Sequence, residues 1–247
     1  MDAISTTERY YAHWLGGDAR VLRTDGVRCV YSSERNVTQY GFVRQFDVYC
    51  WCQQGRIIIS YGDRAAEKID ALSRALRLPI AVAELAQLFE DAFGVEPKHD
   101  LKFAYTDPRG VSGIAQTLGC GDYARFLDFF KRGNPNDTDI DWLREYFDSM
   151  AADGTCVGVF DGGSLVCCTD APGMPYLRGE VQEIGINTLP AHRRRGYAAA
   201  AVTQCAANII KLGKCPLWSC NAENHASEQL AYSVGFTKSA DVLTLTL

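Results

Sequence analysis

"EIGINTLPAHRRRGYAAAAVTQCAANIIKLG", residues 183–213, is the stretch that decides the fold. A strand is predicted over 180–189, and Pro190 ends it because proline lacks the N–H group that a sheet needs. Three consecutive arginines, Arg193 to Arg195, lead into Gly196, and the alanine-rich segment after it predicts a helix of about four turns. The chain therefore passes from a strand through a basic turn into a helix.

A basic turn between a strand and a helix favours an anion site. The first N–H groups of a helix have no partner within the helix, and the helix dipole adds partial positive charge, worth roughly 0.3–1 kcal/mol per interaction. Gly196 has no Cβ, so a phosphate can approach its backbone closely. The alternative is a solvated basic loop before an ordinary core helix, and this segment alone does not separate the two.

The composition argues against several classes of protein. The chain has 247 residues, enough for one large domain or two small ones, and its 47% apolar and 22% charged residues are typical of a globular protein. A net charge of −5 argues against a nucleic-acid partner. No apolar stretch reaches the ~18 residues of a membrane helix, and the acidic N-terminus does not read as a signal peptide. We therefore expect a cytoplasmic protein without membrane or nucleic-acid partners.

Ten cysteines raise the question of disulfides or zinc. No C-x-x-C pair occurs, and most cysteines sit in apolar runs such as "VYCWC" and "SLVCC", where cysteine behaves as a small hydrophobic residue. We expect free thiols in a reducing compartment and no metal site.

The first hundred residues predict a mixed α/β unit. Turn residues Gln54-Gly55 join two strand-like runs into a hairpin, and a polar, proline-containing stretch marks a boundary that divides the chain into 1–100 and 101–247. The predicted elements are strands 27–32, 46–52 and 56–61, a helix capped by Asp63 that runs through Leu76, a helix over 81–92 that stops at Gly94, and the boundary stretch 94–100.

The second half alternates strands with amphipathic helices. Its predicted elements are strand 101–106, a helix over 123–132 capped by Asp122, helix 141–152, the hairpin 155–160 and 164–169, strand 180–189, the helix after Gly196, strand 216–221, helix 225–234 and a last strand 240–247.

Other motifs are weak or missing. "GCGDYA" (119–124) matches the G-x-G-x-x-A of dinucleotide folds, but nothing before it reads as a buried strand. The sequence contains neither the G-x-x-x-x-G-K-[ST] of nucleotide triphosphatases nor the G-x-S-x-G of α/β-hydrolases. The isolated His192 beside the arginines is expected to face solvent.

Two motifs in order carry a family resemblance. R-x-x-G-x-A, read from Arg193 to Ala198, resembles the coenzyme A pyrophosphate loop of the GNAT acyltransferase superfamily. "NAENHASEQLAYSVGF" (221–236) resembles its second motif through Asn224, Ser227, Leu230, Gly235 and Phe236. The chain from about 101 is similar to a GNAT core, and closest to the subgroup of GNAT acetyltransferases with an extra N-terminal region. The resemblance implies an α/β (α+β) fold whose mixed, splayed central sheet is flanked by helices and preceded by a smaller α/β region.

The resemblance also implies binding sites for acetyl-CoA or coenzyme A. Backbone amides of Arg194 to Ala198 would hold the pyrophosphate, and the arginine side chains would add charge. Strand 184–188 would pair with the pantetheine arm through its edge. Asn224 would hydrogen-bond the cofactor, although its position equally suits a helix N-cap. The implied cofactor-binding residues are Ile186, Asn187, Thr188, Arg193, Arg194, Arg195, Gly196, Tyr197, Ala198, Asn224 and Ser227.

The implied acetyl transfer needs a neutral amine. Deprotonating a lysine-like amine of pKa ~10.4 at pH 7 costs roughly 4.6 kcal/mol, so a general base is useful. GNAT enzymes often carry a catalytic Glu on this strand, where Glu183 is the first candidate and Glu180 the second. The alternative is that Glu183 simply faces solvent.

A general acid is harder to assign. Many GNAT enzymes place a Tyr directly after the Leu of the second motif, but Ala231 stands there and Tyr232 comes one residue later. One residue turns a helical side chain by ~100°, so Tyr232 is either the acid or a packing residue.

The resemblance implies an acetyl-CoA-dependent N-acetyltransferase, with a small or protein amine as acceptor. The alternative is a non-catalytic acyl-CoA-binding or sensory module. We expect residues 1–100 to shape the acceptor site or to form a subunit contact in a homodimer.

Overall fold

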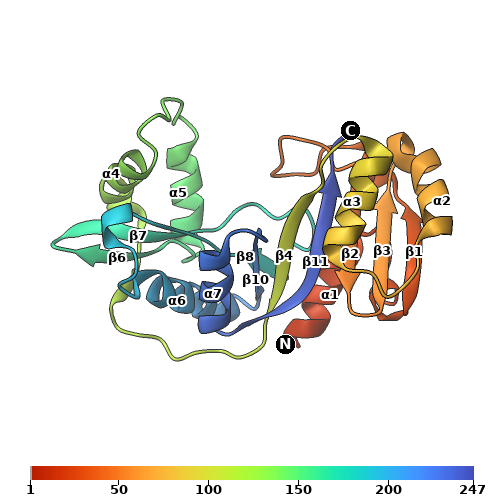
Figure 1. The fold of residues 1–247 in the computed structure, drawn as a ribbon. Helices are drawn as coiled ribbons and strands as arrows, with labels where there is room; N and C mark the ends of the chain where they lie inside the picture. The colour runs from red at the N-terminus through yellow and green to blue at the C-terminus, as the bar shows by residue number, and fades with distance from the viewer. Residues whose placement is uncertain (1) are drawn as a thin grey trace.

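Two sheets organise the chain, and the computed structural model describes residues 2–247 of it (Figure 1). The larger sheet has seven strands in the order β1-β3-β2-β11-β4-β10-β8, and the smaller has four in the order β5-β6-β7-β9. The strands of the larger sheet are β1 (Gly26–Tyr31), β2 (Val48–Gln53), β3 (Arg56–Tyr61), β4 (Lys98–Tyr105), β8 (Val181–Glu183), β10 (Cys215–Asn221) and β11 (Phe236–Leu245). Those of the smaller are β5 (Ala115–Thr117), β6 (Val157–Asp161), β7 (Ser164–Asp170) and β9 (Gly185–Thr188).

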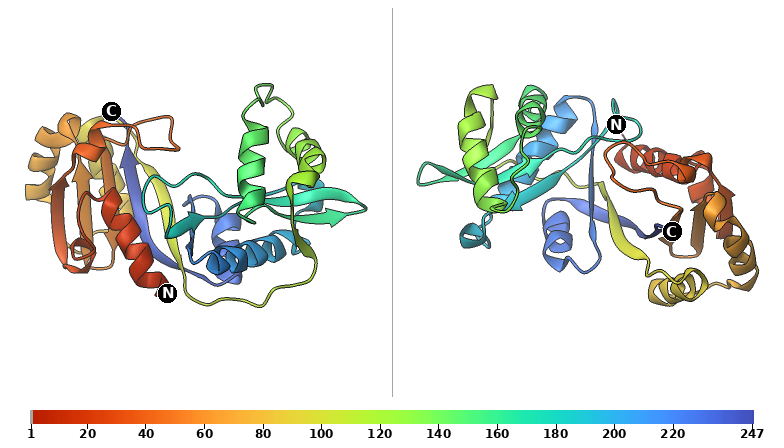
Figure 2. Two further views of the ribbon diagram at one scale, coloured as in Figure 1. Left: turned by 180° about the vertical axis from the view of Figure 1, so that it is seen from behind. Right: turned by 90° about the horizontal axis from the view of Figure 1, so that it is seen from above.

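Helices cover both faces of each sheet. They are α1 (Ala3–Trp14), α2 (Ala66–Ala75), α3 (Val82–Phe93), α4 (Tyr123–Gly133), α5 (Leu143–Ala152), α6 (Tyr197–Lys211) and α7 (His225–Ser233). In the N-terminal half, α1 and α3 lie on opposite sides of the strands (Figure 2). In the smaller sheet, α4 and α5 cover one face and α6 the other (Figure 1). The predicted mixed sheet flanked by helices is confirmed.

The predicted strand 180–189 is divided between the two sheets. β8 runs parallel to β10, and the amide of Ile184 still donates to the carbonyl of Leu217 at 3.0 Å. β9 instead pairs antiparallel with β7, and Gly185 lies opposite Asp170. At Gly185 an added Cβ would lie only 3.0 Å from the Asp170 Cβ, so the two strands approach closely there. The sheets therefore diverge after Ile184 and leave a fork between β9 and β10.

Strand β4 crosses the predicted boundary at residue 100. It begins at Lys98, inside the stretch 94–100, and lies between β10 and β11 in the large sheet. β2 from the N-terminal half pairs with β11 from the end of the chain. The division into 1–100 and 101–247 stays a prediction about folding units, although the two parts share one continuous sheet.

Two predicted helix caps use their carboxylates differently. Asp63 accepts hydrogen bonds from the Tyr31 hydroxyl at 2.8 Å and from Asn36 at 2.9 Å. Asp122 accepts a bond from the Gly119 amide at 3.0 Å, ahead of its helix. Neither carboxylate therefore caps the first helical N–H groups. Asp63 bonds the distant segment 31–36, and Asp122 closes the turn before its own helix.

Two further strands differ from the sequence-based prediction. The last strand begins at Phe236 rather than residue 240, directly after Gly235, whose φ is +103°. A three-residue strand, β5, does precede the stretch 119–124, but two of its three residues are exposed at the edge of the sheet.

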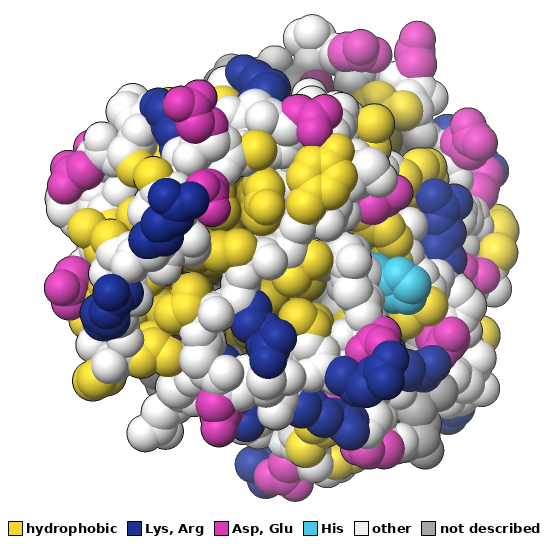
Figure 3. All heavy atoms as spheres, turned by 90° about the vertical axis from the view of Figure 1, so that its right-hand side faces the viewer, with side chains coloured by type: hydrophobic (Ala, Val, Ile, Leu, Met, Phe, Trp, Pro, Cys, Tyr) yellow, Lys and Arg dark blue, Asp and Glu magenta, His cyan; other side chains and the backbone are white. Residues whose placement is uncertain are grey.

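All ten cysteines carry free thiols, and seven of them are buried. Within residues 2–247, no helix has both the length and the apolar character needed to cross a bilayer. The face over the N-terminal half interleaves acidic and basic side chains (Figure 3), so no single-sign field dominates that view.

Candidate active site

The basic turn before α6 forms an open backbone cradle. Arg194 has φ +64° and Gly196 has φ +79°, both in the left-handed region that glycine tolerates best. A Cβ built on Gly196 would meet nothing within 4 Å, so this backbone faces open space. The first N–H groups of the 15-residue helix α6 have no acceptor within the helix. The turn can therefore accept an anion through its backbone.

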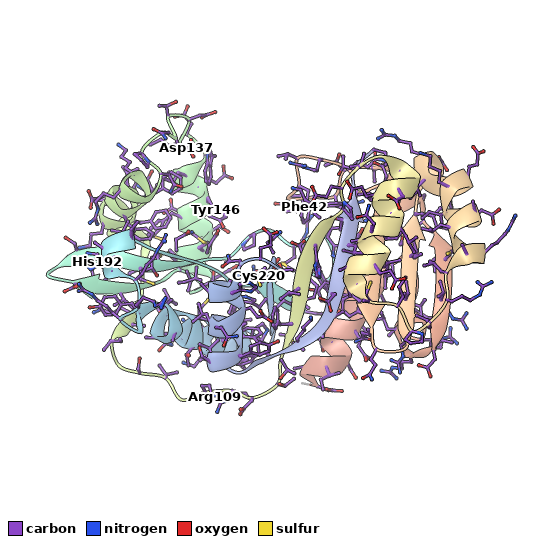
Figure 4. The ribbon with its side chains drawn as sticks, in the orientation of Figure 1. Phe42, Arg109, Asp137, Tyr146, His192 and Cys220 are labelled. Atoms are coloured by element: carbon purple, nitrogen blue, oxygen red, sulfur yellow. The ribbon has the colours of Figure 1, made fainter. Side chains whose placement is uncertain are left out.

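Asp161, at the end of β6, anchors this turn. Its Oδ2 accepts a hydrogen bond from Arg195 Nη1 at 3.0 Å and one from the Tyr197 hydroxyl at 3.3 Å, and lies 3.1 Å from His192 Nδ1. His192 is thus half-buried against a carboxylate instead of facing solvent, and Figure 4 labels it beside the start of α6. The aspartate fixes the turn and offsets part of its positive charge.

The predicted pantetheine strand has one paired edge and one edge on the fork. β9 pairs with β7, and the side chain of Ile186 packs into the core that α6 covers. Asn187 and Thr188 line a cavity of about 200 Å³ between β9 and the helices α4 and α5. Arg193 lines it too, and its Nε donates to the carbonyl of Thr188 at 3.1 Å. Of the predicted cofactor residues, those between Ile186 and Ala198 therefore lie in one run of the chain, from β9 at the fork through the turn to the start of α6.

Asn224 caps α7. Its Oδ1 accepts a hydrogen bond from the Ser227 amide at 3.1 Å. This bond engages only the oxygen of an exposed side chain, and the NH₂ group can still donate to a ligand. The cap and the proposed cofactor contact are therefore compatible.

Glu183 lies at the base of the fork. It is the last residue of β8, it is half-buried, and its carboxylate accepts a hydrogen bond from Ser219 Oγ on β10. The side chain lines a cavity of about 160 Å³ rather than facing open solvent. Glu180, the second candidate, has a side chain that is 41% exposed and forms an ion pair with Arg9 Nη2 at 2.5 Å. Of the two acids, Glu183 is the one that lines this cavity next to the fork.

Much of this cavity comes from the N-terminal half. Six aromatic side chains form its walls, namely Tyr10, Tyr11, Trp14, Phe42, Phe46 and Tyr49. The polar lining comes from the sheet, namely Asp100, Lys102, Glu183, Ser219 and Thr244. Sequence reasoning missed every one of these except Glu183. The aromatic run "ERYYAHW" in α1 was the available signal, because residues 10, 11 and 14 fall on one helical face.

Tyr232 is turned toward the outside of α7. Its side chain is 38% exposed, its ring packs edge-on against Phe103 at 5.6 Å, and its hydroxyl donates to Glu228 at 3.3 Å. Partial burial and the Glu228 carboxylate raise the pKa of Tyr232. Ala231, at the position where a tyrosine was expected, is fully buried. Tyr232 is not among the residues that line the Glu183 cavity, so its role as an acid stays a prediction.

Residues 140–243 match the GNAT acetyltransferase family. The match covers less than half of the chain, and over these residues the protein is similar to a GNAT acetyltransferase domain. The matched segment contains the basic turn, both strands of the fork and α7.

Solved structures have a similar fold. A GCN5-related N-acetyltransferase from Sphaerobacter thermophilus matches with a TM-score of 0.50 and 20% identity, over 66% of this chain and 55% of that one. A GNAT-family acetyltransferase from Colwellia psychrerythraea gives a TM-score of 0.49 and 16% identity, over 61% of this chain and 56% of that one. The yncA protein of Salmonella typhimurium, whose structure contains acetyl-CoA, gives a TM-score of 0.43 and 15% identity. The match covers 54% of this chain and 91% of that one.

The chain spans little more than half the length of the first two structures. At 20% identity the likeness to the Sphaerobacter protein shows the fold alone. No curated protein matches this sequence significantly.

Proposed function

We propose that the chain is an acetyl-CoA-dependent N-acetyltransferase that acetylates a primary amine. The observation that carries the proposal is the position of Glu183. It stands at the base of the fork, with the backbone cradle of Gly196 beyond one end of β9 and a cavity on its own side. One acid thus borders both the predicted path of the acyl donor and a space for an acceptor.

The residues along the fork fit acetyl-CoA. The amides of Arg194 to Ala198 would bind the pyrophosphate, and the fork edge of β9, from Ile186 to Thr188, would hold the amide-bearing arm as an added strand would. Asn224 would donate to the same ligand from the end of β10. Acetyl-CoA supplies an acetyl group already activated as a thioester.

Glu183 would remove a proton from the ammonium group of the acceptor. The Ser219 hydroxyl donates to this carboxylate and holds it at the cavity wall. A positioned base of this kind is typically worth ~10²–10⁴ in rate. No acid for the departing thiolate is assigned, since the Tyr232 hydroxyl is engaged by Glu228.

That missing acid favours a second candidate function, a non-catalytic acyl-CoA-binding or sensory module. Calorimetry with acetyl-CoA and mass spectrometry of amines incubated with protein and acetyl-CoA separate the two. Binding together with an acetylated amine supports the enzyme. Binding without any acetylated product supports the second candidate, and no binding contradicts both. A cytoplasmic location and a homodimer remain predictions.

A further inference from the structure

We propose that the Glu183 cavity takes a small primary amine that carries an aromatic or similarly flat apolar body. The ammonium group would meet Glu183, and the apolar body would lie among the rings from α1, β2 and the loop 42–46. The transfer of an acetyl group to this amine rests on the function proposed above, whereas the binding of the amine does not.

The walls are aromatic, well buried and mutually packed. Trp14 is 3% exposed and stacks on Tyr49, which is 4% exposed, with 5.0 Å between ring centroids and 18° between planes. Phe42 and Phe46 meet Trp14 edge-on at 5.4 and 5.8 Å. Rings held this way offer flat apolar surfaces, and an aromatic ligand gains affinity from each well-placed ring contact beyond its burial.

The size of the cavity suits one ring with a short chain. Its volume is about 160 Å³. An apolar cavity of about 150 Å³ elsewhere is known to hold benzene. Phe42 is 41% exposed and lies on the side of the N-terminal half that faces α5 and Tyr146 (Figure 4), so it stands at the rim.

The charged residues that line the cavity are Asp100 and Lys102 on β4 and Glu183 on β8. Of the charged groups that line the cavity, Asp100 lies 3.5 Å from Lys102 Nζ, and these two charges offset each other. Glu183 accepts a bond from the neutral Ser219 hydroxyl, so its charge is not balanced by that contact. An ammonium group is therefore best placed at Glu183.

Arg35 strengthens this orientation from behind the aromatic wall. Its side chain is buried, with the guanidinium carbon 5.1 Å from the Trp14 ring centroid and 5.7 Å from that of Tyr49. It is not among the residues that line the cavity. Its nearest polar contact is Tyr176, whose hydroxyl lies 3.5 Å away and donates to Glu34. A buried positive charge behind these rings disfavours a second cation there, so the apolar part of the ligand belongs at that end.

Calorimetry on the full chain without acetyl-CoA tests the inference with three probes. Phenylethylamine carries the ring and the charge, 2-phenylethanol carries the ring alone, and n-butylamine carries the charge alone. We expect phenylethylamine to bind at least about tenfold more tightly than either partial probe. Equal binding of the three, or stronger binding of a short lysine-containing peptide than of phenylethylamine, would overturn the proposal.

Two variants locate the binding. Phe42→Ala should weaken phenylethylamine about tenfold, while Val43→Ala, a change at the next residue, which is 96% exposed, should not weaken it. Glu183→Gln should weaken phenylethylamine but leave 2-phenylethanol unchanged, a result that a general loss of structure would not give. Equal effects of the Phe42 and Val43 variants would contradict the assignment of the cavity.

The outcome also distinguishes this inference from the proposed function. If phenylethylamine binds in the cavity but neither it nor any other amine is acetylated, the binding site stands and the enzyme assignment fails. If other amines are acetylated while phenylethylamine neither binds nor reacts, the enzyme assignment stands and the acceptor class is wrong.

Discussion

The turn before α6 and the cavity beside Glu183 are built in opposite ways. The turn is a single run from Arg193 to Ala198, and its anion-binding groups are backbone amides whose direction follows from local φ angles. The cavity collects side chains from α1, the loop 42–46 and five strands of the large sheet. A site made of backbone can be recognised in a short motif, whereas a site made of side chains from distant segments cannot.

We expect acetyl-CoA binding by the turn to be most sensitive to substitution at Gly196. Gly196→Asp puts a side chain on a backbone with φ +79° and a negative charge where the pyrophosphate is expected. Losing several charge-assisted hydrogen bonds, each worth about 1.5–3 kcal/mol, should take acetyl-CoA binding below detection by calorimetry.

A matched control is Gly55→Asp in the β2–β3 hairpin. Gly55 has φ +76° and equally open surroundings, but lies outside the fork. The Gly55→Asp variant should bind acetyl-CoA as tightly as the wild-type protein. Normal binding by the Gly196 variant would remove the turn from the cofactor site.

The next largest effect is expected on the cavity side, at Glu183. Glu183→Gln is nearly isosteric and leaves the turn intact, so acetyl-CoA affinity should stay near the wild-type value. The catalytic rate at neutral pH should fall by ~10²–10⁴ and recover partly as pH rises, because hydroxide then deprotonates the amine. Glu180→Gln, at an exposed ion pair, should retain the rate. A full-rate Glu183→Gln enzyme would show that the cavity acid is not the base.

Asn224 tests whether a cap can also bind the cofactor. Asn224→Ala should lower the free energy of unfolding by about 1 kcal/mol and weaken acetyl-CoA roughly tenfold, because it removes both the cap and the amide donor. Asn224→Ser keeps a capping oxygen but no amide. The Asn224→Ser variant should thus preserve the unfolding midpoint and still bind acetyl-CoA weakly. If it binds as tightly as wild type, Asn224 acts only as a cap.

The smallest effect is expected at Tyr232. Tyr232→Phe keeps the ring against Phe103 and loses only the bond to Glu228. We expect steady-state rates within about twofold of wild type, since an exposed hydrogen bond of this kind contributes little. A large fall in rate with unchanged acetyl-CoA affinity would mean that the hydroxyl reaches the departing thiolate in the working enzyme.

The sequence alone determined the parts of this protein that depend on neighbouring residues. It predicted the β2–β3 hairpin at Gln54-Gly55, the helix after Gly196 and the end of α3 at Gly94. Each rests on periodicity or on a turn residue with a required φ angle, and such signals lie within a few positions of one another. The basic turn belongs to this class.

Only the tertiary structure decided how strands were paired. β4 lies between β10 and β11, which follow it by more than a hundred residues. The predicted strand over 180–189 breaks because its first half pairs with β10 and its second half pairs with β7. The contact between Asp161 and Arg195, and the cavity that Trp14 and Glu183 both line, follow from the same long-range pairing. A strand's own residues favour extended backbone but do not specify its neighbour, so the fork and the cavity emerge only when the sheets assemble.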